Sequence, residues 1–158
     1  MDAGANRELF KRREQMWNSG NTDLVDQLFA ADFVGHTPHQ QIRGSEELKA
    51  LVGQIHEAFP DFSLTYDPVV ASEDHVAVMV TIHGTHDGSL AGLEPTGKEV
   101  EFTGMIISRI DGGKVVEEWR YMDTIGLLEQ LGVELGSDEA EQIMVGVGEE
   151  EERRLHQN

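Results

Sequence analysis

The stretch KEVEFTGMIISRIDGGKVVEEWRYMD, residues 98–123, decides the fold. On both sides of Asp111-Gly112-Gly113 apolar and polar residues alternate, and a period of two is typical of β-strands. Asp-Gly-Gly has the composition of a tight hairpin turn. The sequence therefore predicts two antiparallel strands joined at this turn.

Two more strands are predicted before this hairpin, in FSLTYDPVVA (62–71) and HVAVMVTIHGTHDG (75–88). Upstream of Pro60 the spacing of apolar residues changes to that of amphipathic helices, in segments near 5–18, 22–29 and 45–59. FVGHTP, between the second and third of them, is interpreted as a brief extended piece. We expect an α+β domain in which three N-terminal helices cover one face of an antiparallel sheet.

The chain has 158 residues, of which 39% are hydrophobic, enough for one core. We expect one domain over residues 1–132, followed by an acidic C-terminal tail, 133–158, with at most a short helix. The sequence contains no apolar run long enough to span a membrane and no signal-peptide core, which predicts a cytoplasmic protein. The absence of cysteine excludes disulfides and thiolate chemistry.

The charge is strongly acidic, with 30 Asp and Glu residues against 12 Lys and Arg, a formal net charge of −18. Such a surface repels nucleic acid and anionic membranes, so neither is expected as a partner. Acidic excess with only four lysines is typical of a halophilic protein from a salt-rich cytoplasm, and an ordinary acidic protein is the alternative.

Asp123 is the first candidate for chemistry, because the strand pattern puts it on one face with Trp119 and Tyr121. Two interpretations compete. Asp123 could cap the helix that TIGLLEQLG predicts, or it could be a desolvated general acid/base at the mouth of a pocket.

The histidines are the other polar candidates. His36 follows apolar residues and is assigned to the pocket, whereas His39 is assigned to solvent. His83 and His86 are three residues apart on a predicted strand and project to opposite sides, so we expect no metal site there.

Three blocks resemble a known family: MWNSGNTDLVDQLFAADFVGHTP (16–38), GTHDGSLAGLEPTGKEVEFTG (84–104) and GGKVVEEWRYMDTIGLLEQLG (112–132). They are similar to the SnoaL-like polyketide cyclases, often called ester cyclases, of the nuclear-transport-factor-two-like superfamily. The resemblance implies a cone-shaped, strongly bent antiparallel sheet around an apolar pocket, and commonly a sheet-to-sheet dimer. It also implies aldol-type ring closure without metal or organic cofactor, with an aspartate as acid/base at the position of Asp123.

The function predicted from these observations is a cofactor-independent enzyme of the cyclase or isomerase type that acts on a small apolar carbonyl compound. A non-catalytic ligand-binding or dimerisation module of the same fold is the alternative. A homodimer is expected, on the premise that Val78, Val80 and Ile82 face outward from the sheet. The residues assigned to the site are catalytic Asp123 and His36, with pocket residues Trp17, Phe33, Phe59, Met79, His83, Met105 and Trp119.

Overall fold

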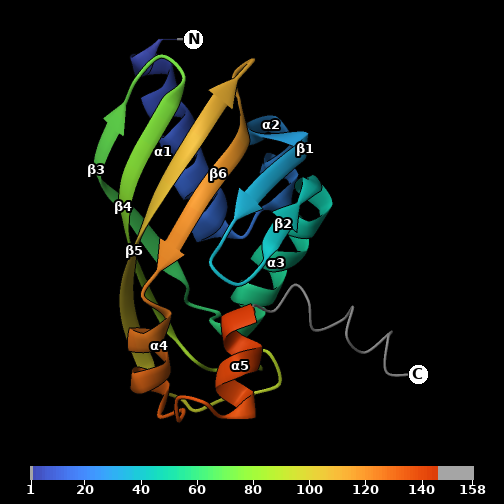
Figure 1. Cartoon of the computed structure of the whole chain (residues 1–158), viewed down its shortest axis with the longest axis vertical. Helices are drawn as coiled ribbons and strands as arrows, with labels where there is room; N and C mark the ends of the chain where they lie inside the picture. Colours follow the sequence, from blue (N-terminus) through green and yellow to red (C-terminus); the bar gives the residue numbers. More distant parts are fainter. Residues whose placement is uncertain (1, 146–158) are drawn as a thin grey trace.

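A computed structural model describes residues 2–145 (Figure 1). The helices are α1 (Ala3–Ser19), the 3-10 turn η1 (Thr22–Leu24), α2 (Val25–Leu28), α3 (Gly44–Ala58), α4 (Thr124–Leu131) and α5 (Asp138–Val145). The strands are β1 (Phe29–His36), β2 (Gln41–Arg43), β3 (Ser63–Ala71), β4 (His75–Thr85), β5 (Glu99–Asp111) and β6 (Lys114–Met122). The α+β class is confirmed, although the second N-terminal helix is only η1 followed by one short turn, α2.

The hairpin that the sequence predicted is formed by β5 and β6. Asp111 pairs with Lys114, which leaves Gly112 and Gly113 as a two-residue loop. Their φ angles are 59° and 79°, the left-handed conformation that a type I′ turn requires at both positions and that glycine adopts without steric cost.

The six strands form one sheet in the order β2-β1-β6-β5-β4-β3. Strands β3 to β6 are antiparallel neighbours, as expected. The predicted extended piece after α2 is part of β1, which pairs with β6 in the parallel direction. The expectation of a purely antiparallel sheet is therefore wrong. In Figure 1 the long strands are strongly bent, and α1 and α3 lie against the concave side.

The two faces of the sheet differ sharply in burial. Val76, Val78 and Val80 are buried on the concave inner face, while the alternate residues of β4 point to the convex outer face. The premise that Val78, Val80 and Ile82 face outward is therefore wrong. These β-branched and aliphatic residues form the most apolar set on the strand, so they are the set that the helices cover.

The segment after Gly132 contributes to the core within the described part of the chain. Helix α5 buries Ala140 and Ile143 against the rest of the domain, so the predicted short helix is present but is not part of a loose tail. The last part of the predicted tail, 146–158, lies outside the described residues. Among the described helices none is long and apolar enough to cross a membrane.

Candidate functional site

A pocket of about 190 Å³ lies between the inner face of the sheet and the helices. Every layer of the fold contributes to its wall, including α5 and the loop before β5. The apolar lining residues are Trp17, Leu51, Ile55, Phe59, Phe62, Leu64, Val80, Ile82, Leu90, Val100, Phe102, Ile106, Met122, Leu127 and Ile143. The remaining lining residues are Gly84 and three with polar side chains, Tyr66, Arg120 and Thr124.

Arg120 is the one charged side chain among the described lining residues. It projects inward because β6 places Glu118, Arg120 and Met122 on the inner face, and Ile106 of β5 is its cross-strand partner. The guanidinium lies over the Trp17 ring, 5.6 Å from the ring centroid. Its side chain is only 12% exposed, so this cation is held in largely apolar surroundings.

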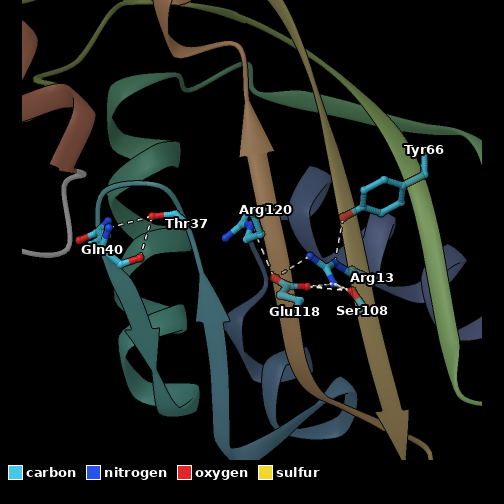
Figure 2. A network of polar contacts seen from close by, with 7 residues as sticks. All are labelled: Arg13, Thr37, Gln40, Tyr66, Ser108, Glu118 and Arg120. Atoms are coloured by element: carbon cyan, nitrogen blue, oxygen red, sulfur yellow. Dashed lines mark hydrogen bonds and ion pairs between the residues drawn. The ribbon is translucent and has the colours of Figure 1, made fainter.

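A buried polar network lies next to Arg120 (Figure 2). Arg13 Nη1 and Nη2 donate to the two carboxylate oxygens of Glu118, at 2.6 and 3.2 Å. Ser108 Oγ donates to Glu118 Oε2 at 3.0 Å, and Arg13 Nε donates to Tyr66 Oη at 3.0 Å. Figure 2 shows Glu118 between Arg13 and Arg120. Because the bidentate geometry fixes this carboxylate on Arg13, Arg120 receives only a longer contact, 3.6 Å from its Nε to Glu118 Oε1.

The titration of these groups follows from burial and charge. Burial alone would raise the pKa of Glu118, but the charges of Arg13 and Arg120 and the hydrogen bonds from Arg13 and Ser108 lower it below its ordinary value. Burial lowers the pKa of Arg120, an effect that Glu118 opposes in part. Burial also raises the pKa of Tyr66, so its phenol stays protonated near neutral pH.

Trp17 has a buried donor without a partner beside the pocket. The side chain is 3% exposed and lines the pocket, and its Nε1 has no hydrogen-bond partner within residues 2–145. Buried polar groups are normally paired, so this indole N–H, which has almost no accessible surface, is a donor left without a partner beside the pocket.

The structure brings two of the seven predicted wall residues, Trp17 and Phe59, to the pocket. Phe33 is fully buried but packs on Phe29, with ring centroids 5.0 Å apart, and does not line the pocket.

Four predicted wall residues lie on the outer face of the sheet: Met79, His83, Met105 and Trp119. Their assignment to the pocket is wrong. Alternation identified which residues share a face, but the face that the helices cover is the one that carries Val80 and Ile106, not the one that carries the methionines.

His36 also lies away from the pocket. Its Nε2 is 2.7 Å from Glu117 Oε2, and its ring stacks on Trp119 with centroids 5.5 Å apart. The hydrogen bond from His36, with that of Arg109 and their charges, lowers the pKa of Glu117 although burial opposes the shift. His36 is therefore part of a polar cluster on the outer face.

Asp123 is exposed and caps α4, where its Oδ1 accepts a hydrogen bond from Gly126 N at 2.9 Å. Its neighbours Met122 and Thr124 line the pocket, but Asp123 does not. The observed contact is the one that the capping alternative required.

His83 and His86 project to opposite sides, as expected, with His83 exposed and His86 fully buried. Within the described residues no group of three or more His, Asp or Glu side chains could hold a metal ion.

Sequence reasoning missed Arg120, Tyr66 and the Arg13–Glu118 pair. A signal was present, because alternation along VVEEWRYM places Glu118 and Arg120 together, opposite Trp119. The face with Trp119 was chosen as the pocket wall because no partner for the charge on the opposite face was evident from the sequence. That partner, Arg13, is more than 100 residues away in sequence.

Comparisons with known proteins agree with this architecture. The family described as SnoaL-like polyketide cyclase matches residues 7–131. The chain belongs to this family. Aklanonic acid methyl ester cyclase DauD of Streptomyces sp. (strain C5) is 26% identical over 133 residues, which cover 79% of this chain and 80% of DauD. The nogalonic acid methyl ester cyclase of Streptomyces nogalater is 26% identical over 126 residues, covering 78% and 94% of the two chains.

Solved structures show the same fold. IdmH from Streptomyces antibioticus matches with a TM-score of 0.71 and 29% identity, covering 80% of this chain and 98% of that one. TsrD from Streptomyces laurentii matches with a TM-score of 0.77 and 24% identity, covering 85% and 99%. The SnoaL-like family and fold predicted from the sequence are confirmed.

Proposed function

We propose that the protein is a polyketide-cyclase-type enzyme that closes or rearranges a small carbonyl compound in the inner pocket, without a cofactor. Membership of a cyclase family and the two cyclase relatives support this reaction class. The observation that carries the proposal is Arg120, the one charged side chain among the described residues of a mostly apolar wall. In such surroundings a fixed positive charge stabilises an oxygen that becomes negative during reaction.

The proposed substrate has an acidic carbon between two carbonyl groups. Such a carbon gives its proton to water or buffer, and Arg120 stabilises the enolate oxygen that results. The apolar wall holds the substrate so that its enolate carbon lies against its second carbonyl carbon, where the new bond forms. The alkoxide produced by ring closure takes a proton from solvent, so the sequence of steps returns the proton that was removed.

The catalytic roles proposed from the sequence for Asp123 and His36 are not needed in this scheme. Asp123 holds the start of α4, and His36 lies on the outer face. The cyclase proposal therefore rests on Arg120 and the shape of the pocket.

A binding module without catalysis is the second candidate. It is favoured by one observation: the described lining residues include no carboxylate and no imidazole that could take a proton from carbon.

Carbon–hydrogen exchange separates the two candidates before the natural substrate is known. The exchange of the central methylene of methyl acetoacetate in D2O is followed by NMR with wild type, Arg120→Met and Asp123→Asn. We expect wild type to accelerate exchange over buffer, Asp123→Asn to match it, and Arg120→Met to lose on the order of 100-fold of the acceleration. Wild type no faster than buffer would reject the cyclase proposal in favour of the binding module.

We also propose a symmetric dimer formed through the outer face of the sheet. Met105, Ile107 and Tyr121 are 61%, 48% and 62% exposed there, and Met105 pairs across the strands with Tyr121. An exposed apolar surface of this kind is suited to a symmetric contact. Light scattering should give twice the chain mass for wild type and one chain mass for Met105→Glu; one chain mass for wild type would reject the dimer.

A further inference from the structure

The buried cluster around the pocket carries an unbalanced charge. It contains two guanidinium groups, Arg13 and Arg120, and one carboxylate, Glu118, which is fully buried. Tyr66 adds no negative charge because its phenol is protonated near neutral pH. Two positive charges against one negative charge leave an excess of one positive charge, which is costly in apolar surroundings unless an anion compensates it.

The excess positive charge lies on Arg120, at the pocket. Glu118 is bound through both oxygens to Arg13, and its only contact with Arg120 is at 3.6 Å. Arg120 has no hydrogen bond of normal length to any other group within residues 2–145, although its side chain carries a fork of N–H donors and lines the pocket. The Trp17 ring, whose Nε1 is buried without a partner, packs against the same guanidinium.

The pocket also limits the size of a ligand. Its volume is about 190 Å³, below the roughly 300 Å³ at which most small-molecule sites begin. An engineered apolar cavity of about 150 Å³ holds a benzene molecule. The pocket is partly open, and its inner part accommodates about one ring or a short branched chain beside a small polar group.

We propose that the pocket selects a compact organic monoanion whose negative charge is shared by two oxygens, with Arg120 as its donor and the Trp17 ring as part of the wall beside it. Both an enolate flanked by two carbonyls and a carboxylate have this chemistry, and either fits the planar donor fork of an arginine. The inference deepens the proposed function, on which it rests for the location of the ligand. It adds that the ligand is bound as an anion and that the part of it held inside the pocket is about the size of one ring.

The test is binding by calorimetry at neutral pH, with probes matched in shape. Benzoate represents the carboxylate and 1,3-cyclohexanedione, which is ionised at this pH, represents the enolate. Benzamide and cyclohexanone are their neutral counterparts, and anthracene-9-carboxylate is an anion with three fused rings. We expect one or both compact anions to bind wild type saturably, about tenfold or more tighter than their neutral counterparts, and the large anion to bind more weakly than the compact ones. Whichever compact anion binds more tightly identifies the source of the charge.

Variants of two arginines, Arg120 and Arg109, locate the anion. Arg120→Met keeps the length of the side chain and removes the charge, and it should weaken anion binding by about tenfold or more. Arg109→Met makes the same change on the outer face, where Arg109 contacts Glu117, and should leave binding unchanged. Circular dichroism checks that each variant is folded, and Arg120→Lys, which keeps the charge without the fork, should bind anions with intermediate affinity.

The inference is overturned if the neutral probes bind as tightly as the anions, if Arg120→Met binds the anions as well as wild type does, if the three-ring anion binds most tightly, or if no compact anion binds. These results are distinguishable from failure of the proposed function. Anion binding without carbon–hydrogen exchange would reject the enzyme and keep the anion site. Exchange with equally tight binding of the neutral probes would keep the enzyme and reject the anion site.

Discussion

The inner and outer faces of the sheet are built from alternate residues of the same strands, yet they have different roles. Glu118 and Ile106 point inward and are buried, Glu118 against Arg13 and Ile106 in the pocket wall. Their chain neighbours Glu117 and Ile107 point outward, where they are partly exposed. The comparison teaches that a charged residue with its partner far away in sequence can be more deeply buried than an adjacent aromatic or aliphatic one. Neighbouring residues therefore give matched pairs of mutations, in which only the face differs.

The largest expected effect comes from the two adjacent carboxylates. Glu118→Gln leaves Arg13 and Arg120 buried without a counter-charge and should lower the free energy of unfolding by about 3–5 kcal/mol. Glu117→Gln removes a carboxylate from the outer face, where water and salt already screen it, and should have a far smaller effect. Urea denaturation compares the two; equal losses would mean that the inner network does not hold the domain together.

The two adjacent isoleucines are the apolar counterpart. Ile106→Ala removes a buried side chain from the pocket wall and should cost about 2–4 kcal/mol. Ile107→Ala removes a half-exposed side chain and should change the stability of one chain by no more than about 0.5 kcal/mol. The measurement is urea denaturation at a protein concentration low enough to dissociate a dimer. A larger loss for Ile107→Ala would reverse the assignment of the two faces.

Two variants of Asp123 test its role as a helix cap. Asp123→Ala removes the acceptor for Gly126 N and should lower stability by about 0.5–2 kcal/mol. Asp123→Asn should be close to wild type, because asparagine caps helices about as well as aspartate. Thermal melts measure both variants. Wild-type stability for Asp123→Ala would show that the cap contributes nothing in solution.

The pH dependence of stability gives a smaller effect with a defined sign. The pKa of Glu118 in the folded protein is below its ordinary value of 4.5. Its ionised form therefore stabilises the fold fully above that value, and the contribution is lost as the pH falls from 4.5 toward the lowered pKa. The stability difference between wild type and Glu118→Gln should shrink over this range, and a difference that grows on acidification would contradict the buried ion pair.

The sequence predicted the local structure well because local signals determine it. The hairpin at Gly112-Gly113, the strands β3 to β6 and the helix after Asp123 each follow from periodicity and turn chemistry within a few residues. The parallel strand β1 could not be predicted in this way, because its position beside β6 depends on contacts more than 80 residues apart.

The site was harder to predict for a related reason. Alternation divided β4 and β6 correctly into two sets of residues, but the choice of the inner set depends on what the helices bring. Arg13, on α1, makes a buried Glu118 possible, and Glu118 in turn lies beside Arg120. Without knowledge of that pair, the aromatic set with Trp119 was the more plausible lining, and four of the predicted wall residues were placed on the wrong face.

The two tryptophans, one on each face, provide the most direct test of the claim that ligands bind on the inner face. Trp17 lines the pocket, and Trp119 stacks on His36 outside it. Protein labelled with 5-fluorotryptophan gives one fluorine resonance for each, which Trp119→Phe assigns. During titration with benzoate we predict that the Trp17 resonance shifts saturably while that of Trp119 stays in place. A shift of Trp119 with Trp17 unchanged would place the ligand on the outer face and contradict the account.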